Sequence, residues 1–350
     1  MGAASGLYGA AEVPVGRLIR LTLWALIGFI AWAGWILLRP LDPVALPYEF
    51  TVRPGQSLSS VSRDLQPQGL EQPWLMTAYG RLSGEAARIK PGIYRVEQPS
   101  SPYTLLARMA QGDSLRTKLT LIEGWNLQQV RAAIAQERYL VHDSAALSDA
   151  ELARRLSGKP AASPLEGLLF PDTYLVDAGV SDLEVLRLAA EAMQNRLAAA
   201  WEKRAPNLPY RTPYEALIMA SIIEKETGDG AERARIAAVF INRLRIGMPL
   251  QTDPTVIYGL GKRYDGNLRR ADLRADTPYN TYTRRGLPPT PIAMPGMAAI
   301  EAALHPAEDK ALYFVGRGDG THQFSATLAE HNRAVVQYQI RPALKQRSAR

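Results

Sequence analysis

The longest apolar segment of the chain runs from Leu21 to Leu38, eighteen residues without a charged side chain. A helix of that length spans about 27 Å, close to the thickness of a bilayer core. A cleaved signal peptide is the alternative, but its apolar region is usually about 7–15 residues long, and no small-x-small cleavage site follows here. The pattern predicts an uncleaved membrane anchor over residues 17–39, preceded by a tail of residues 1–16.

The flanking charges predict an orientation for this anchor. Arg17 and Arg20 precede the apolar segment, and Arg39 follows it. Because basic residues favour the cytoplasmic side of a membrane, the tail is expected in the cytoplasm and residues 40–350 on the outer side. The difference is small, since two arginines precede the segment and one follows it.

Short alternating and helical patterns follow the Pro-rich residues 40–47. The predicted strands are Tyr48–Val52, Ile93–Val96 and Thr117–Ile122, and the predicted helices begin at Ser57 and cover Trp74–Leu82 and Tyr103–Gln111. Pro54-Gly55 is a turn signal between the first strand and the first helix. Together these elements predict a small α+β module over residues 45–122.

The rest of the chain has mainly helical spacing. Residues 123–210 include an amphipathic helix over Leu183–Trp201. The helix predicted over residues 212–227 differs, because its interior from Ala216 to Ile223 is apolar on all sides apart from Ser221, which indicates burial on all sides. A further helix over Ala231–Ile246 and a β-hairpin formed by residues 312–315 and 322–325 complete the prediction.

Both ends of the helix predicted over residues 212–227 carry residues that typically start or stop a helix. Thr212 suits the N-cap position, Pro213 the first turn, and Glu215 the third position of a capping box. Gly228 and Gly230 are expected to end the helix.

Two carboxylates, Glu224 and Glu226, fall in the last turn of this helix. Burial and the negative end of the helix dipole both disfavour an ionised carboxylate, and so raise its pKa toward the range of a general acid. Residues two apart on a helix point in different directions, so the two cannot share a site. The apolar neighbours Met219, Ile222 and Ile223 favour Glu226; the alternative is that both carboxylates are solvated at a frayed end.

Two later loops carry further polar and aromatic residues. Gln251 and Asp253 precede a helix that begins near Pro254, and Asp253 has the alternative role of capping that helix. Asn280 and Tyr282 bring an amide and an aromatic ring into one loop. Such groups provide the hydrogen-bonding edge and the stacking face that a sugar cleft uses.

Composition and charge narrow the class of protein. With 350 residues, 47% hydrophobic and 21% charged, the chain is neither disordered nor a polytopic transporter. Its net charge of +7 suits an anionic partner such as an acidic polymer. The absence of cysteine excludes disulfides, thiolate zinc sites and cysteine nucleophiles.

Other kinds of site find little support in the sequence. The four histidines, at positions 142, 305, 322 and 331, are scattered, so we predict no metal site and no cofactor. Neither a G-x-S-x-G elbow nor a Walker phosphate loop is present. Nucleic-acid binding is disfavoured because most of the basic residues fall in the part of the chain expected on the outer side of the membrane. The basic C-terminal tail is interpreted as a solvated end.

The chain contains a series of short motifs in a fixed order. In order, the chain contains Phe170-Pro-Asp-Thr-Tyr174, SIIEKET, VFINRLRIGMPLQTDPTVIYGLG, YNTYTRRGLPPTPI, LYFV and EHN. In these motifs and in their order, residues 45–340 resemble the endolytic murein transglycosylase family (MltG type, YceG-like). The strand, Pro-Gly turn and helix after residue 48 also resemble the opening of a LysM domain, which binds glycans.

The resemblance implies a fold and an activity. It implies an α+β protein with a single transmembrane helix, a LysM-like module and a mainly helical, lysozyme-like catalytic domain over residues 123–345. Such an enzyme sits in the cell inner membrane with its catalytic part in the periplasm. It cuts nascent peptidoglycan strands and leaves 1,6-anhydro-N-acetylmuramic acid ends. Peptidoglycan synthases are candidate partners.

The family's catalytic acid is the Glu before Thr in its EKET motif, which is Glu226 here. We assign sugar positioning to Gln251, Asp253, Asn280 and Tyr282. The rival hypothesis is a non-catalytic glycan-binding scaffold of the cell-wall synthesis machinery.

Overall fold

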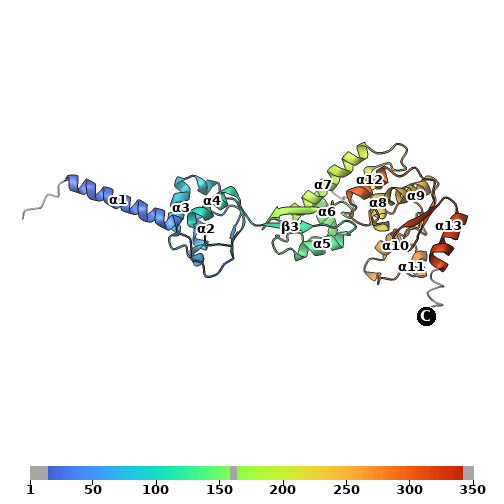
Figure 1. Cartoon of the computed structure of the whole chain (residues 1–350), viewed down its shortest axis with the longest axis horizontal. Helices are drawn as coiled ribbons and strands as arrows, with labels where there is room; N and C mark the ends of the chain where they lie inside the picture. Colours follow the sequence, from blue (N-terminus) through green and yellow to red (C-terminus); the bar gives the residue numbers. More distant parts are fainter. Residues whose placement is uncertain (1–14, 158–163, 342–350) are drawn as a thin grey trace, which may run out of the picture. The chain divides into compact units, whose positions relative to one another are not determined.

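The computed structural model describes residues 15–157 and 164–341, which combine helices with two-stranded sheets, the mixed fold expected from the sequence (Figure 1). The predictions for the N-terminal tail and for the C-terminal end beyond residue 341 fall almost wholly outside these residues. The chain divides into two compact units. The small unit extends to Thr117 and includes Asp177–Gly179, and the large unit comprises residues 118–176 and the chain from Val180 onward.

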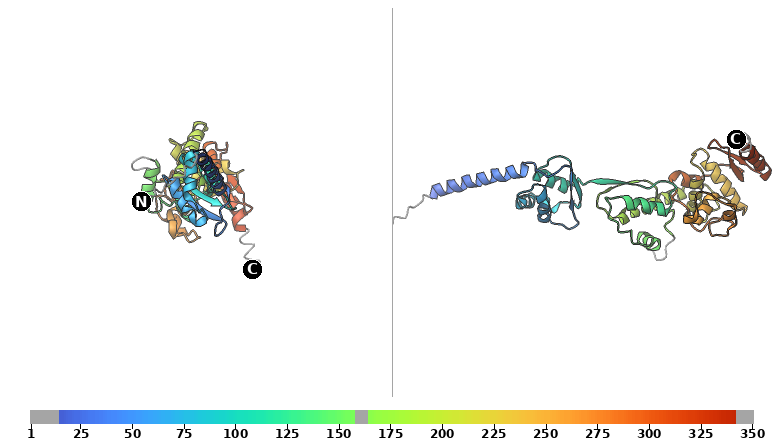
Figure 2. Two further views of the ribbon diagram at one scale, coloured as in Figure 1. Left: turned by 90° about the vertical axis from the view of Figure 1, so that its left-hand side faces the viewer. Right: turned by 90° about the horizontal axis from the view of Figure 1, so that it is seen from below.

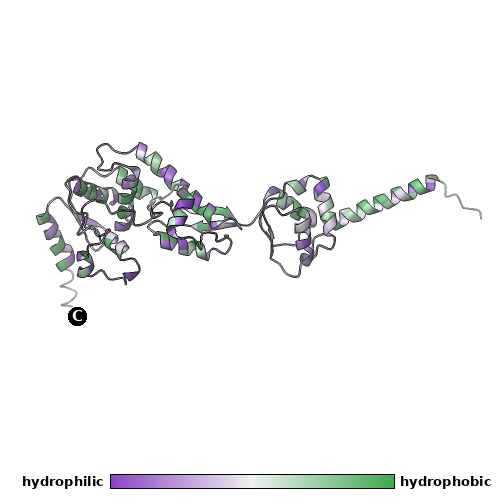
Figure 3. Ribbon diagram, turned by 180° about the vertical axis from the view of Figure 1, so that it is seen from behind, coloured by the Kyte–Doolittle hydropathy of each residue, from purple (hydrophilic) through white to green (hydrophobic). Residues whose placement is uncertain are grey.

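The small unit begins with α1 (Val15–Leu38), a continuous helix that extends from the rest of the unit (Figure 2). Within the described residues it is the one helix long and apolar enough to cross a membrane. Figure 3 shows hydrophobic residues along most of its length. Thr22 donates its hydroxyl to the carbonyl of Ile19 at 2.9 Å, so this polar group is satisfied inside the helix.

The remainder of the small unit is a two-stranded sheet covered by helices. Its elements are β1 (Tyr48–Val52), α2 (Leu58–Asp64), η1 (Gln66–Gln68), α3 (Pro73–Leu82), η2 (Glu85–Ala87), β2 (Gly92–Val96) and α4 (Pro102–Gln111). The strands are antiparallel, with Tyr48 opposite Val96. Ser57 caps α2, as its position after the Pro-Gly turn suggests. Alternate residues of both strands and the inner faces of the helices form one apolar core.

Aromatic rings connect the second half of α1 to α3. The ring of Trp74, at the start of α3, lies 6.4 Å from the rings of both Phe29 and Trp32. Leu37 packs against the core of the unit. Since each ring pair at such a distance contributes about 0.5–1.5 kcal/mol beyond burial, the last turns of α1 belong to the packing of the small unit.

The large unit is mainly helical. In chain order, the elements from the linking strand onward are β3 (Arg116–Thr120), α5 (Leu127–Gln136), α6 (Asp149–Ser157), β4 (Thr173–Asp177), α7 (Asp182–Glu202), α8 (Pro213–Glu226), α9 (Arg233–Arg245), α10 (Asp253–Leu260), η3 (Gly261–Arg263), α11 (Arg270–Arg274), α12 (Met297–Leu304), β5 (Tyr313–Gly316), β6 (His322–Ser325), α13 (Leu328–Val335) and η4 (Val336–Ile340). Strand β4, which pairs with β3, lies in a segment expected to be mainly helical.

Helix α8 organises the large unit. It contacts α7, α9, α10 and α12 (Figure 1). Every side chain from Ala216 to Ile223 is buried, as the mainly apolar pattern predicted. Burying a large apolar side chain contributes about 1.5–3 kcal/mol, so this helix is firmly fixed. Strands β5 and β6 form the predicted hairpin, with Tyr313 opposite Ser325.

Candidate active site

The catalytic candidate stands at the C-terminal end of α8. Thr212 caps the start of this helix by accepting a hydrogen bond from the amide of Glu215 at 3.3 Å. Glu215 accepts from the amide of Arg211 instead of Thr212, so only half of the predicted capping box forms. The helix ends because Thr227 is extended (φ −143°), and not through the glycines that follow. Glu226 is thus the last residue of a helix whose position is set by burial.

The two carboxylates of the last turn point to different partners, as their spacing predicted. Glu224 accepts a hydrogen bond from the backbone amide of Gly296 at 3.0 Å. Glu226 accepts one from the hydroxyl of Thr252. Glu226 lines the cavity described below, and Glu224 is not among the lining residues.

A buried threonine cluster fixes the donor to Glu226. Thr252, Thr255 and Thr281 are each at most 2% exposed. The amide of Thr252 donates to the hydroxyl of Thr281 at 3.1 Å, and the hydroxyl of Thr255 donates to the carbonyl of Thr252 at 2.8 Å. Thr252 occupies the N-cap position of α10, yet its hydroxyl makes no cap bond and is used for Glu226.

The surroundings of Glu226 shift its pKa upward. Burial raises the pKa of this carboxyl, and the nearby negative charge of Asp253 raises it further. Thr252, His322 and Arg243 act in the opposite direction without cancelling the rise. The protonated acid therefore persists to higher pH than in an exposed glutamate.

A cavity of about 530 Å³ opens beside Glu226. Three of the residues assigned to sugar positioning line it: Gln251, Asp253 and Tyr282. The hydroxyl of Tyr282 donates to Asp253 at 2.6 Å, which fixes both side chains. Gln251 has a left-handed backbone (φ +52°), a conformation that is uncommon for non-glycine residues and concentrated at functional sites.

The structure places Asn280 differently. Its side chain is fully buried, and its amide donates to the carbonyls of Asp272, Leu273 and Ala275 at 3.2, 3.1 and 2.7 Å. Its side-chain oxygen accepts from the amide of Tyr282 at 2.9 Å. Asn280 thus orders the loop that presents Tyr282 and does not line the cavity.

The cavity also contains residues that the sequence did not single out as site residues. Arg243 is buried, and donates to the carbonyls of Leu312 and Leu250 at 2.6 Å each. His322 bonds through Nδ1 to Glu232 at 2.7 Å. In the sequence, an arginine among the apolar residues of α9 was a signal that could have pointed to Arg243. The position of His322 in the hairpin gave no such signal.

Within residues 15–157 and 164–341, no three or more His, Cys, Asp or Glu side chains are grouped closely enough to hold a metal ion. The motif residues Phe170, Asp172 and Tyr174 are not among the residues that line the cavity of Glu226, and they make contacts within the fold. Tyr174 donates its hydroxyl to the carbonyl of Phe170 at 2.7 Å, and Arg196 pairs with Asp172 at 3.1 Å.

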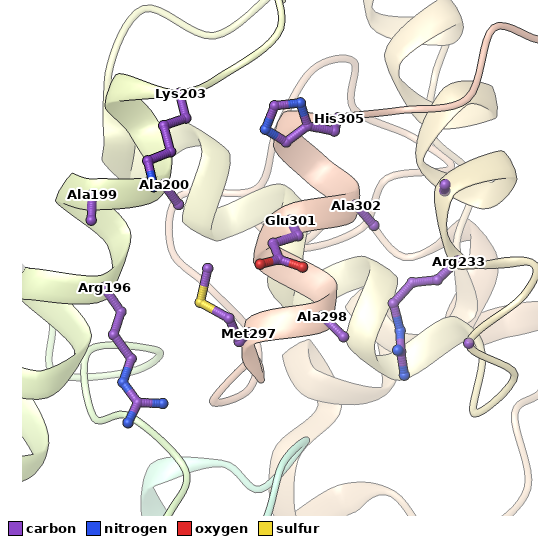
Figure 4. A pocket seen from close by; sticks show the side chains of 12 residues that line it. Arg196, Ala199, Ala200, Lys203, Arg233, Met297, Ala298, Glu301, Ala302 and His305 are labelled. Atoms are coloured by element: carbon purple, nitrogen blue, oxygen red, sulfur yellow. The ribbon is translucent and has the colours of Figure 1, made fainter.

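A separate hollow of about 660 Å³ lies on the same unit between α7, α9 and α12 (Figure 4). Figure 4 shows the Glu301 carboxylate at its centre, with Arg196, Lys203 and Arg233 around it. No residue predicted for the site lines this hollow, so it is distinct from the cavity of Glu226.

Comparison with known proteins adds an independent line of evidence. A model of the YceG-like family matches residues 50–337. An endolytic murein transglycosylase of Bacillus subtilis (strain 168) is 34% identical over 318 residues, covering 85% of this chain and 88% of that protein. One of Streptococcus pneumoniae serotype 2 is 28% identical over 335 residues, and the match spans 60% of its length.

A solved structure is also similar. The crystal structure of a yceG-like protein from Listeria monocytogenes superposes with a TM-score of 0.51 at 29% identity. The match covers 82% of this chain and 98% of that one.

Proposed function

The chain belongs to the YceG-like family, and on that premise we propose that it cuts peptidoglycan glycan strands at a site built around Glu226. It is a lytic transglycosylase, as the names of its curated relatives indicate. The observation that carries the site assignment is a carboxyl of raised pKa, fixed at the end of a buried helix and lining a cavity.

The proposed reaction breaks the β-1,4 bond between N-acetylmuramic acid and N-acetylglucosamine. Protonated Glu226 gives its proton to the glycosidic oxygen as the bond to C1 breaks. The resulting carboxylate takes the proton of the muramyl C6 hydroxyl while that oxygen closes on C1. The product is a 1,6-anhydro end, no water is consumed, and Glu226 is again protonated.

A single acid suffices because the nucleophile belongs to the substrate. Hydrolytic glycosidases usually need a second carboxylate as nucleophile or base. Asp253 is the other carboxylate in the cavity, and its oxygen is engaged by the hydroxyl of Tyr282. Asp253, Tyr282 and Gln251 are proposed to orient the sugars, and Asn280 to act indirectly by holding Tyr282.

The proposed location follows from α1. As a membrane anchor with Arg17 and Arg20 on the cytoplasmic side, it would leave the catalytic part in the periplasm. We further propose that residues 45–122 are a LysM-like glycan-binding module, that residues 123–345 are a lysozyme-like catalytic domain, and that synthases supplying nascent strands are partners.

Product analysis tests the proposal. The full chain is incubated with peptidoglycan, and the fragments are identified by mass spectrometry for the parent and for Glu226→Gln. We expect anhydro-muropeptides from the parent and a loss of at least about a hundred-fold in the variant, since general acid catalysis contributes that much.

Glu224→Gln is the matched control, because the same substitution two residues away leaves the cavity unchanged. It should retain activity. Products with reducing ends would mean hydrolysis. Retained glycan binding without any product from the parent would favour the non-catalytic scaffold.

A further inference from the structure

A larger cavity, of about 850 Å³, lies on the same unit as the catalytic one. The two cavities share the end of α8 and the start of α10 as walls. Lys225 and Pro254 line the larger cavity, and their immediate neighbours Glu226 and Asp253 line the smaller one. A polymer bound at Glu226 therefore has a second hollow next to it.

One wall of this cavity carries a buried acid that the proposed reaction does not use. Glu166 is 5% exposed and accepts hydrogen bonds from the amide of Leu127 at 3.1 Å and from the hydroxyl of Tyr258 at 3.0 Å. Burial raises the pKa of Glu166 to about 7. A polar group of perturbed pKa inside a large cavity is typical of a binding site.

Aromatic rings form a second part of the wall. Tyr258 and Tyr279 contact each other edge to face at 4.9 Å, and the hydroxyl of Tyr279 pairs with Thr290 at 2.9 Å, so both rings are fixed. Tyr264 is half-buried and lines the same cavity. Rings of this kind provide apolar faces on which sugar rings can stack.

The charges in the wall favour an anion. Lys225 and Lys262 line the cavity, together with the acids Glu166 and Asp149. Asp149 is already paired with Arg131 at 3.1 Å, and Glu166 is buried among hydrogen-bond donors. Lys225 donates to the carbonyl of Gly124 at 3.2 Å, which fixes its positive charge at the cavity wall, and Lys262 is the second cation there that can meet a ligand.

We propose that this cavity is a second saccharide site, which holds the same strand beyond the bond being cut and prefers sugars that bear carboxylates. The inference rests on the proposed glycan-cutting function. Tyr264 supplies the stacking face, and Lys262, with Lys225, selects the carboxylate, such as the lactyl group of N-acetylmuramic acid. Binding of remote sugars in this way supplies energy that an enzyme can use at the reacting centre.

The test measures binding to the full chain by calorimetry in the Glu226→Gln background, which prevents cutting. The ligands are peptide-free strands with free lactyl carboxylates and neutral chitin oligosaccharides of equal length. Lys262→Gln should weaken binding of the charged strands about two- to five-fold at low salt and leave the neutral ones unchanged. Tyr264→Ala should weaken both about three- to ten-fold.

Lys203→Gln is the control, because this lysine lines the separate hollow of Figure 4. It should bind both ligands like the parent. High salt should abolish the difference caused by Lys262→Gln, because exposed charges are screened. Thermal melting confirms that each variant is folded.

Three results would overturn the proposal: equal losses for both ligands in Lys262→Gln, the same loss in Lys203→Gln, or unchanged binding in Tyr264→Ala. The catalytic assignment is judged separately, by the products of the chain with Glu226 intact. The expected binding pattern without anhydro products would refute that assignment and leave the second site standing.

Discussion

At the scale of single residues, the hydroxyl of Thr252 distinguishes Glu226 from Glu224. Both carboxyls have a raised pKa because both are removed from water. Only Glu226 combines a side-chain donor with a neighbouring carboxylate, Asp253, which acts in the opposite direction. Substitutions of Thr252 and of Asp253 should therefore shift the pKa of Glu226 in opposite directions.

Replacing Thr252 by valine keeps the shape of the side chain and removes the donor. The ionised form of Glu226 loses a hydrogen bond, so its pKa should rise further. Because the reaction begins from the protonated acid, the alkaline limb of the pH profile of kcat should move upward by about one unit. Steady-state rates measured across pH check this, and a downward movement would contradict the assigned hydrogen bond.

The substitution Asp253→Asn should have the opposite effect. Removing the negative charge makes ionisation of Glu226 easier, which lowers its pKa and moves the alkaline limb of kcat downward by about half a unit to one unit. KM should also rise, because Asp253 is proposed to orient the sugar. A profile identical to that of the parent would show that Asp253 does not act on Glu226.

Sequence reasoning reached some of these residues and missed others for a physical reason. Glu226 could be singled out because its surroundings are formed by residues close to it in sequence, at the end of a mainly apolar helix. Asp253 was the residue considered as a helix cap, and its neighbour Thr252, which occupies that position and donates to Glu226, was not singled out. His322 reaches the cavity from a hairpin almost a hundred residues away. Asn280 stood in the right loop, but only the structure shows that its amide faces the backbone.

At the scale of elements, the cap of α8 should matter for stability more than for chemistry. Thr212→Ala removes the hydroxyl that accepts from Glu215, which should cost about 1 kcal/mol and lower the melting temperature by about 2–4 °C. Thr212→Ser, which keeps the oxygen, is the control and should melt close to the parent. A loss of kcat with unchanged melting would instead place the start of α8 in the catalytic process.

The success of element prediction depended on how local each signal was. Helix α8 and the strand Tyr48–Val52 were predicted because their patterns are complete within a few turns or residues. Strand β4 was missed, since a five-residue strand is defined by its partner β3, more than fifty residues earlier. The end of α8 was assigned to glycines, whereas Thr227 ends it by turning extended.

At the scale of the whole molecule, removal of residues 1–39 should affect membrane attachment and leave catalysis intact. The truncated chain should keep its catalytic activity and leave the membrane fraction. It also loses Phe29, Trp32 and Leu37, which pack on the small unit, so the melting temperature of that unit should fall. Cell fractionation and calorimetry check both effects; a truncated chain that stays in the membrane fraction would contradict a single anchor.

The buried threonine cluster has a consequence for how such an enzyme can diverge. Thr255 and Thr281 are not among the residues that line either cavity, yet they hold the group that tunes the acid. A change at Thr255 would adjust the working pH through Thr252, whereas a change at Thr281 would also reach sugar recognition, because its carbonyl accepts from the amide of Gln251 at 3.1 Å. Adaptation to acidic or alkaline surroundings is therefore open to this fold through Thr255 without loss of its specificity.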